Sequence, residues 1–353
     1  MTKLRDGVAR RKRKPSMDVT RFERDDEDMT RSVLLLCLLL ACDPVERASE
    51  AGASTDSTPS AASSASVAAS TPEAPTSAPE PANTAAATTE AAESAPPKAD
   101  PSRLVLEGKA VQGGLMRARI DKGTNRVKFP GHRVVISPEG KFLIGFYRNA
   151  PQKETLTITL PDGAVLEKVF EVEQRTYEDD RIDNLPEHFV KLDPATQRKL
   201  AAANARIAVA RRKYSDRSDY EKGFIWPVRG KITSRYGQKR YLNGTDGGIH
   251  WGVDIAAPVG TAVKAPAGGV VVFAERDVPL AGHTLVIDHG HGLTSTLIHL
   301  NSFAKKVGDE VAQGDVVATV GMTGRTNGAH LDWRMNLFED YRLDPELLVP
   351  PME

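Results

Sequence analysis

The sequence predicts a mainly β protein, in which a C-terminal antiparallel β domain follows a disordered N-terminal tether, a small antiparallel β domain and a linking helix. Three observations support this prediction. Residues 154–172 ("ETLTITLPDGAVLEKVFEV") alternate apolar and polar positions around a PDG turn, as half-buried strands do. Short apolar runs broken by Gly and Pro fill residues 222–349. Residues 46–100 are rich in Ala, Ser, Thr, Pro and Glu.

The overall composition excludes several kinds of protein. The chain has 353 residues with 47 Lys and Arg against 47 Asp and Glu, so its net charge gives no reason to expect a nucleic-acid partner. Its two cysteines, Cys37 and Cys42, both lie in one apolar run near the N-terminus. The predicted domains therefore hold neither a disulfide framework nor a zinc site built from cysteines.

That apolar run is interpreted as a secretion signal. In "MTRSVLLLCLLLAC" (29–42), the apolar stretch 33–41 is shorter than the ~20 residues that cross a bilayer, but it has the length of a signal-peptide core. The ending LLAC resembles a bacterial lipobox, whose cysteine is lipidated and becomes the mature N-terminus. We assign 1–42 to a signal and lipobox region, with Cys42 as the lipidated residue and Met29 as the true start. The alternative is a cytosolic protein with a chance apolar run.

The following segment, residues 43–100, is predicted to be a disordered linker. It has too few large apolar side chains to offset the entropy lost on ordering. Its prolines and acidic residues favour extended conformations. Such a linker would let the folded domains reach away from a membrane-held N-terminus.

Residues 101–178 are predicted to form the small β domain. Besides the strand pair at 154–172, the stretch "HRVVISPEGKFLIGF" (132–146) places two apolar runs around a Pro-Glu-Gly turn. A helical linker is predicted for 179–221, because Asp193 is a candidate N-cap and Pro194 fits the first helical position. Apolar side chains then recur at helical spacing up to Tyr214, which indicates a packing or spacer helix.

Residues 222–353 form the last predicted domain, and the residues suited to chemistry are concentrated there. It contains six of the eight histidines: His250, His283, His289, His291, His299 and His330. In "HWGVD", His250 and Asp254 would share one face of a strand, and so would His330 and Asp332 in "AHLDW". His299 ends an apolar strand in "TSTLIHL". Histidine and carboxylate ligands with further imidazoles nearby are what a catalytic zinc site requires.

Three blocks of this domain, in this order, resemble the lysostaphin-type (LytM-like) zinc metalloendopeptidases, which cleave peptide bonds in bacterial peptidoglycan. The blocks are "HWGVDIAAPVGTAVKAPAGGVV", "VIDHGHGLTSTLIHL" and "VGDEVAQGDVVATVGMTGRTNGAHLDW". The resemblance covers 222–349 and implies an antiparallel sheet with a substrate groove. The small β domain and the helix resemble the region before the peptidase in one Gram-negative branch of the family.

The resemblance also implies a role for each matching residue. His250 and Asp254 would be the first two zinc ligands. His299 and His330 would be the catalytic histidines, which polarise a metal-activated water and stabilise charge on the scissile carbonyl oxygen. The family's third ligand is a second histidine, and Asp332 stands at that position here. The substrate-binding candidates rank below these residues. They are Arg240 and Asn243 in the groove, and His289 and His291 in a turn beside it.

Asp332 is expected to preserve zinc binding. An Asp oxygen lies as many bonds from Cα as the Nδ1 of His, so it can reach a metal at a normal Zn–O distance of about 2.0–2.2 Å. A second carboxylate also cancels more of the charge of the ion. The activated water should then have a pKa above the usual ~7, and hydrolysis at neutral pH should be slower.

The sequence thus predicts a zinc metalloendopeptidase that hydrolyses peptidoglycan crosslinks. It would be a membrane-anchored lipoprotein of the bacterial cell envelope that faces the periplasm. The alternative is a catalytically weak or inactive LytM-like regulator that activates another envelope hydrolase. Such proteins typically lose several site residues, whereas both catalytic histidines remain here. A carrier domain, which "VGDEVAQGDVVATVG" also resembles, would need a modified-lysine motif at a hairpin tip, and none is present.

Overall fold

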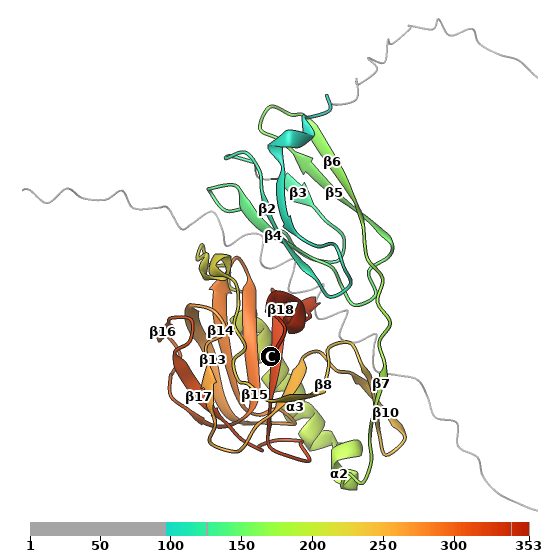
Figure 1. The fold of residues 1–353 in the computed structure, drawn as a ribbon, viewed down its shortest axis with the longest axis vertical. Helices are drawn as coiled ribbons and strands as arrows, with labels where there is room; N and C mark the ends of the chain where they lie inside the picture. Colours follow the sequence, from blue (N-terminus) through green and yellow to red (C-terminus); the bar gives the residue numbers. More distant parts are fainter. Residues whose placement is uncertain (1–96, 125, 340, 353) are drawn as a thin grey trace, which may run out of the picture. The chain divides into compact units, whose positions relative to one another are not determined.

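Two small antiparallel sheets form the N-terminal part of the described fold (Figure 1). The computed structural model describes residues 97–124, 126–339 and 341–352. One sheet has the order β1 (Val105–Gly108), β2 (Leu115–Arg119), β4 (Lys141–Gly145), and the other β3 (Arg126–Lys128), β5 (Lys153–Thr159), β6 (Val165–Glu171). The alternation along β5 and β6 places Leu156, Ile158 and Leu166 in one core with Phe142 and Phe170. The predicted strand pair is therefore confirmed, with its turn between β5 and β6.

One ionisable side chain, Glu154 on β5, is buried against this N-terminal core. It is 7% exposed, and its Oε2 has no hydrogen-bond partner among the described residues. Burial without a compensating partner disfavours the charged form and raises the pKa of Glu154 to about 7. The carboxyl group therefore opposes folding once it is ionised.

Replacing Glu154 with glutamine is expected to flatten the pH dependence of stability. The folded-state pKa of about 7 exceeds the ordinary value of 4.5, so the stabilisation is complete below pH 4.5 and is lost as pH rises through 7. The loss in wild type is at most about 3 kcal/mol, since one pKa unit corresponds to about 1.4 kcal/mol. Denaturant unfolding at pH 5 and pH 8 would measure it. Equal pH dependence in wild type and Glu154→Gln would contradict the expectation.

The linking segment contains a strand as well as helices. The predicted helix is confirmed as α3 (Pro194–Arg212), and the Asp193 carboxylate accepts hydrogen bonds from the backbone of Ala195 and Thr196. A single turn, α2 (Glu187–Val190), precedes it. In the stretch predicted to be helical, β7 (Asp179–Ile182) instead pairs in parallel with β9 (Lys239–Leu242). The short sequence DDRI shows no alternation, so this strand depends on the edge that the β9 hairpin offers.

A ten-stranded sheet dominates the C-terminal part, with the order β16-β13-β14-β15-β18-β11-β8 and three further strands attached (Figure 1). Its neighbouring strands pair in antiparallel fashion, which confirms the mainly β fold class. The remaining strands are β8 (Lys231–Ser234), β10 (Thr245–Ile249), β11 (Val253–Ala256), β12 (Ala262–Lys264), β13 (Gly269–Val278), β14 (Gly282–Gly290), β15 (Leu293–Phe303), β16 (Glu310–Val311), β17 (Val316–Val320), β18 (His330–Leu337) and β19 (Tyr341–Leu343). Short 3-10 helices lie at Pro101–Arg103, Asp219–Lys222 and Pro345–Leu348.

Alternation along β18 separates the core from the opposite face of the sheet. Leu331, Trp333 and Met335 are fully buried in the main core, where Trp333 contacts the ring of Trp226. Residues between them on the strand point to the other face. This alternation places the side chains of Asp332 and His330 on that second face.

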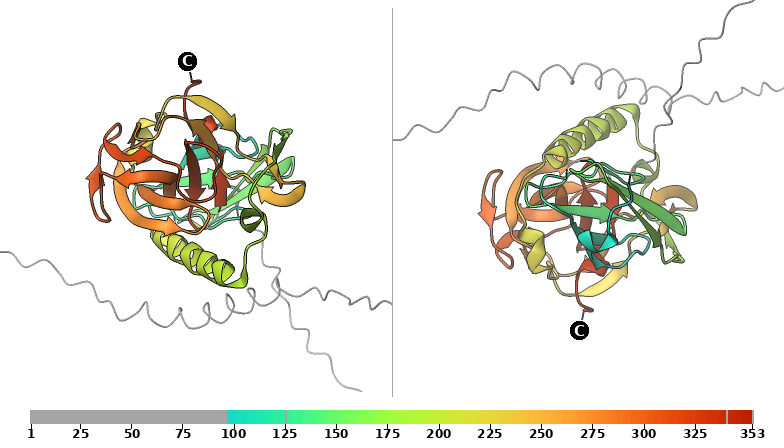
Figure 2. Two further views of the ribbon diagram at one scale, coloured as in Figure 1. Left: turned by 90° about the horizontal axis from the view of Figure 1, so that it is seen from below. Right: turned by 90° about the horizontal axis from the view of Figure 1, so that it is seen from above.

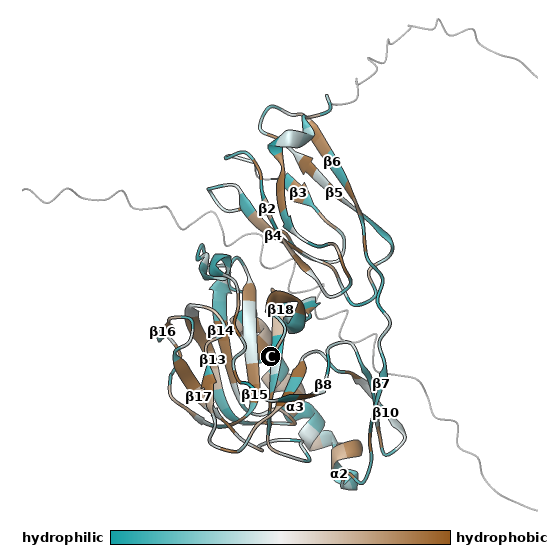
Figure 3. Ribbon diagram, viewed as in Figure 1, coloured by the Kyte–Doolittle hydropathy of each residue, from teal (hydrophilic) through white to brown (hydrophobic). Residues whose placement is uncertain are grey.

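Helix α3 lies against the C-terminal sheet (Figure 2). Ala203, Ile207 and Ala210 pack on Phe273 and Val286 of β13 and β14. Hydrophobic and hydrophilic residues are mixed along the helix (Figure 3), so its apolar contact with the sheet is narrow. Near its end, the Arg211 side chain donates a 2.6 Å hydrogen bond to Thr296 Oγ1 on β15.

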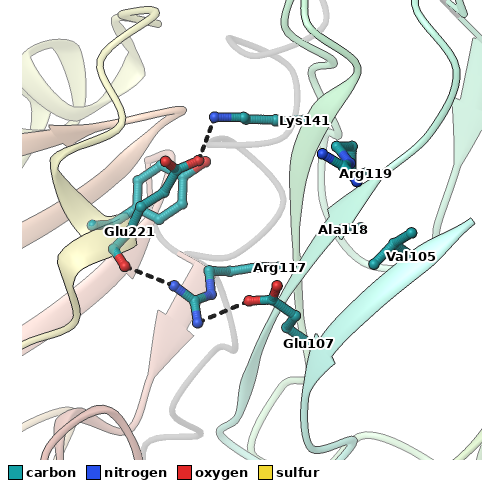
Figure 4. Close-up of a pocket in the computed structure, with 8 residues that line it drawn as sticks. Val105, Glu107, Arg117, Ala118, Arg119, Lys141 and Glu221 are labelled. Atoms are coloured by element: carbon teal, nitrogen blue, oxygen red, sulfur yellow. Dashed lines mark hydrogen bonds and ion pairs between the residues drawn. The ribbon is translucent and has the colours of Figure 1, made fainter.

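A cavity of about 440 Å³ is lined by residues of β1, β2 and β4 and by Tyr220 and Glu221 (Figure 4). Its charged lining is already paired, because Arg117 contacts Glu107 at 3.0 Å and Lys141 contacts Glu221 at 2.7 Å. Arg119 is the remaining cation in its lining. None of the residues predicted for the zinc site lines this cavity.

The predicted signal region, with Met29 and Cys42, and the linker up to residue 96 lie outside the described residues. Among the residues that are described, no helix is both long and apolar enough to cross a membrane.

Candidate active site

The predicted ligands meet where β11 and β18 pair. Asp254 and Asp332 lie directly opposite each other in the antiparallel register, and Ala256 pairs with His330 two positions further along, on the same face. The prediction that His250 and Asp254 share one strand is wrong for His250. That residue precedes β11, and a bend at Gly252 turns the chain so that the imidazole faces the carboxylate.

The donor atoms of the three predicted ligands converge. His250 Nε2 lies 3.1 Å from Asp254 Oδ1 and 3.4 Å from Asp332 Oδ2. One donor atom from each residue lies within 4.8 Å of the other two, and all three side chains are buried. His330 Nε2 is 3.8 Å from Asp254 Oδ1. This spacing brings one nitrogen and two oxygens around a common centre.

The other nitrogen of His250 fixes which ring atom faces that centre. Nδ1 lies 3.1 Å from the carbonyl oxygen of Arg235, which can only accept, so the imidazole donates from Nδ1. Nε2 then presents its lone pair toward two carboxylates, an arrangement that calls for a cation or a proton. Burial disfavours a protonated ring, but Asp254 and Asp332 together outweigh it, so the pKa of His250 is raised when no metal is bound.

Two arginines pair with the carboxylates at this centre. Arg334, two residues along β18, donates to both oxygens of Asp332, and its Nη2 lies 2.6 Å from Oδ2. Arg240 on β9 donates from Nη2 to Asp254 Oδ2 and contacts Asp180 at 3.1 Å. Burial alone would raise the pKa of Asp332, but Arg334 holds it well below its usual value. The two Asp and two Arg side chains therefore sum to zero charge before any ion binds.

This pairing changes the charge balance expected from the sequence. The second carboxylate was expected to cancel part of the charge of a zinc ion. Because Arg334 already neutralises Asp332, the ion would retain more of its charge, and Arg334 would compete with it for the same oxygens. The expected rise in the pKa of the activated water loses its electrostatic basis.

The two predicted catalytic histidines lie side by side, with ring centroids 4.7 Å apart. The loop before β18 orients both rings: His299 Nδ1 donates to the Thr323 carbonyl at 2.8 Å, and His330 Nδ1 donates to the Gly328 carbonyl at 2.9 Å. Nε2 is then the remaining ring nitrogen of each histidine, and that of His330 lies 3.8 Å from Asp254 Oδ1. Burial lowers the pKa of His299 to about 4, so this ring is neutral at physiological pH. Its φ of 61° lies in the left-handed region, a strained conformation typical of functional positions.

The structure brings Arg240 into the site but not the other three groove candidates. Asn243, at the β9–β10 turn, exchanges hydrogen bonds with the backbone of Leu185 in the linker. His289 lies within β14 rather than in a turn, and its ring nitrogens bond Gly268 O and Ser295 Oγ in the interior. His291 does occupy a turn, where its Nδ1 lies 2.8 Å from the Tyr220 hydroxyl. His289 and His291 therefore have structural partners away from the candidate site.

The residues at the centre fit a zinc ion. Asp254 Oδ1 is buried and has no hydrogen-bond partner in the described part of the chain, although Oδ2 is held by Arg240. An orphaned carboxylate oxygen beside an imidazole lone pair is the arrangement that a metal would complete. Asp332 would have to share its oxygens between the ion and Arg334.

Sequence reasoning missed Arg334 and Arg325 as site residues. Arg334 could have been found, because it lies two residues after Asp332 and strand alternation puts both on one face. Arg325 lies in the loop that orients the histidines, and only the fold reveals its neighbours. The link from Arg240 to Asp254 also depends on the fold, since 14 residues separate the pair.

Comparison with known proteins agrees with this geometry. Residues 248–345 match the family model "Peptidase family M23". The cell division protein DipM of Caulobacter vibrioides is 35% identical over 132 residues, which are 36% of this chain and 21% of DipM. The DD-carboxypeptidase/endopeptidase Mpg of Neisseria meningitidis is 35% identical over 107 residues, 30% of this chain and 24% of Mpg. The matches thus span about a fifth to a quarter of these curated relatives.

A solved structure extends the similarity beyond the matched domain. The crystal structure of a candidate M23 peptidase from Pseudomonas aeruginosa superposes with a TM-score of 0.53 at 27% identity. The match covers 68% of this chain and 95% of that one, so it includes the region before the C-terminal sheet. The family model, the relatives and this solved structure thus agree that residues 248–345, which contain the converging donor atoms, are similar to M23 (lysostaphin-like) peptidases.

Proposed function

We propose that this chain is a zinc endopeptidase that hydrolyses peptide crosslinks of bacterial peptidoglycan. The observation that carries the proposal is the buried Oδ1 of Asp254, which accepts no hydrogen bond from the described residues and lies 3.1 Å from His250 Nε2 and close to Asp332. The M23 family match supports it, as do relatives named for peptidoglycan endopeptidase activity. The substrates would be the crosslinked peptides of the wall.

Each site residue has a distinct task under this proposal. His250, Asp254 and Asp332 would hold the zinc ion, which supplies a Lewis acid and lowers the pKa of a water molecule. His299, neutral and with a lone pair on Nε2, is placed to accept a proton from that water. His330, when protonated on Nε2, would donate to the carbonyl oxygen of the scissile bond. The loop carbonyls hold both rings through Nδ1, which leaves Nε2 of each for these roles.

The proposed location follows from the N-terminal signal. Lipidation at Cys42 would anchor the chain in a membrane of the envelope, facing the periplasm. The linker would then let the C-terminal sheet reach the wall. Mass spectrometry of the mature chain tests this directly: a diacylated or triacylated N-terminal peptide beginning at Cys42 is expected, and an unmodified chain beginning at Met1 would refute it.

Metal analysis and turnover together test the enzymatic proposal. The full chain purified in zinc-replete medium is expected to hold one zinc ion and to release fragments from crosslinked muropeptides. His250→Ala is expected to lose both properties, because it removes the only nitrogen ligand. Arg206→Ala is a suitable control, since Arg206 pairs with the exposed side of Glu275 outside the site. A zinc-free wild type without turnover would end the proposal.

A second function has its own supporting observation. The ion pairs of Arg334 with Asp332 and of Arg240 with Asp254 balance the site without a metal. A regulator that binds and activates another envelope hydrolase would need only this stable, metal-free arrangement, and the similarity to a cell division protein is compatible with it. Metal-free wild type that stimulates a wall hydrolase without cleaving muropeptides itself would favour this function.

A further inference from the structure

Arg325 stands out among the cations around the candidate site. It lies in the loop between β17 and β18, and its backbone N–H donates to the Leu280 carbonyl at 2.8 Å. The same loop provides the Thr323 and Gly328 carbonyls that orient His299 and His330. Arg325 is therefore built into the element that sets the positions of both histidines.

The guanidinium of Arg325 has no carboxylate within ion-pair distance among the residues that the structure describes. Within the described chain, its side chain makes one hydrogen bond, from Nη1 to the Phe189 carbonyl of α2 at 3.1 Å. Arg240 and Arg334 differ, because each pairs with a carboxylate of the centre. A guanidinium presents five N–H donors, so most of the hydrogen-bonding capacity of Arg325 is unused within the described chain.

The charges around Arg325 also favour the binding of an anion. Burial lowers its pKa, and the positive charges of Arg240 and Arg334 lower it further. Guanidinium groups nevertheless stay charged in proteins. A partly desolvated cation beside two others, with spare donors, is a local environment that an anion would stabilise.

We propose that Arg325 binds a carboxylate of a peptide ligand beside the catalytic histidines. This inference rests on the proposed function only in taking the ligand to be a wall peptide. The planar fork of the guanidinium would hold the carboxylate through two parallel N–H···O bonds, while Nη1 can keep its bond to Phe189. Arg240 and Arg334 would contribute attraction without direct contact. The site would thus select peptides that carry a free carboxylate near the bond in the groove.

Binding to metal-free full-length protein tests the subsite without depending on turnover. The probes are a soluble tetrapeptide stem with a free terminal carboxylate and the same peptide with that terminus amidated, titrated calorimetrically in the presence of a chelator. Wild type is expected to prefer the acid at least tenfold, as the loss of a charge-assisted pair of about 1.5–3 kcal/mol implies. Arg325→Ala should abolish the preference, and Arg325→Lys should restore only part of it because lysine lacks the fork.

A matched control and clear contrary outcomes complete the test. Arg229→Ala removes an exposed arginine of the same part of the chain and should retain the preference. Equal binding of acid and amide by wild type, no binding of either, or an unchanged preference in Arg325→Ala would overturn the inference. The proposed hydrolysis is judged separately, since carboxylate preference without turnover would remove the enzyme and keep the subsite. Turnover with no carboxylate preference would keep the enzyme and remove the subsite.

Discussion

Replacing Arg334 with alanine is expected to raise the zinc affinity of the chain by roughly 10- to 100-fold. Arg334 donates to both oxygens of Asp332, at 3.0 Å from Nε and 2.6 Å from Nη2. A zinc ion at the centre must share this carboxylate and sit near a fixed positive charge. Two unit charges about 4 Å apart interact by about 4 kcal/mol at an effective dielectric constant of ~20, so even a partly screened repulsion costs one to two orders of magnitude. Competition with a chromophoric chelator would measure the change.

Stability provides a second readout for the same variant. Metal-free Arg334→Ala should unfold more easily than wild type, because Asp332 is left as a buried charge without its partner, a loss of about 3–5 kcal/mol. Zinc should recover that loss, so the zinc-induced rise in melting temperature should be larger than in wild type. Arg206→Ala, which breaks an exposed pair with Glu275, should change neither quantity appreciably. A zinc affinity that stays the same or falls in Arg334→Ala would show that the pair does not oppose metal binding.

The two arginines also set the net charge of the metal-free centre. Two carboxylates and a neutral imidazole alone would leave one negative charge uncompensated on each acid. Arg240 and Arg334 cancel both charges, Arg240 from β9 and Arg334 from β18, the strand that also carries Asp332. The centre is therefore stable without a metal, and metal binding must overcome that stability. Whether zinc or the ion pairs prevail is a matter of a few kcal/mol, which explains why single substitutions should have large effects.

Local patterns made the fold class and most of the candidate site predictable. The strand pair at β5 and β6, the Asp193 cap and the shared strand face of His330 and Asp332 all depend on residues close in sequence. The bend that turns His250 toward Asp254 was not foreseen, because the four-residue spacing equally fits a continuous strand. Non-local partners were beyond reach from one sequence: β7 adds to the edge of β9 across 56 intervening residues, and Arg325 acquires its neighbours only in the folded chain.

Exchanging Asp332 for histidine is expected to weaken zinc binding about tenfold or more when made alone, although histidine is the residue found there in the family. The new imidazole is a good ligand, but the substitution removes the one carboxylate that Arg334 pairs with among the described residues and leaves this half-buried cation beside the ion. Adding Arg334→Gln should reverse the loss, because the neutral amide removes the repulsion. The double variant should bind zinc more tightly than the sum of single effects by about 2–3 kcal/mol, or roughly 30- to 150-fold.

Wild type, Asp332→His, Arg334→Gln and the double variant form a double-mutant cycle. These four proteins should differ in activity and stability as well as in zinc affinity. If hydrolysis depends on the charge left on the ion, muropeptide turnover at neutral pH should follow zinc occupancy across the series and be highest in the double variant. Without metal, Asp332→His and Arg334→Gln should each have a lower melting temperature than wild type, because each leaves one member of the ion pair without its partner. Additive effects on zinc affinity would mean that residues 332 and 334 act independently, and the coupled charge balance of the site would then be the wrong description. Coupled effects on zinc affinity without turnover in any of the four proteins would support the coupled charge balance but favour the regulatory function. A metal site that binds tightly and does not hydrolyse lacks a competent arrangement of His299 and His330.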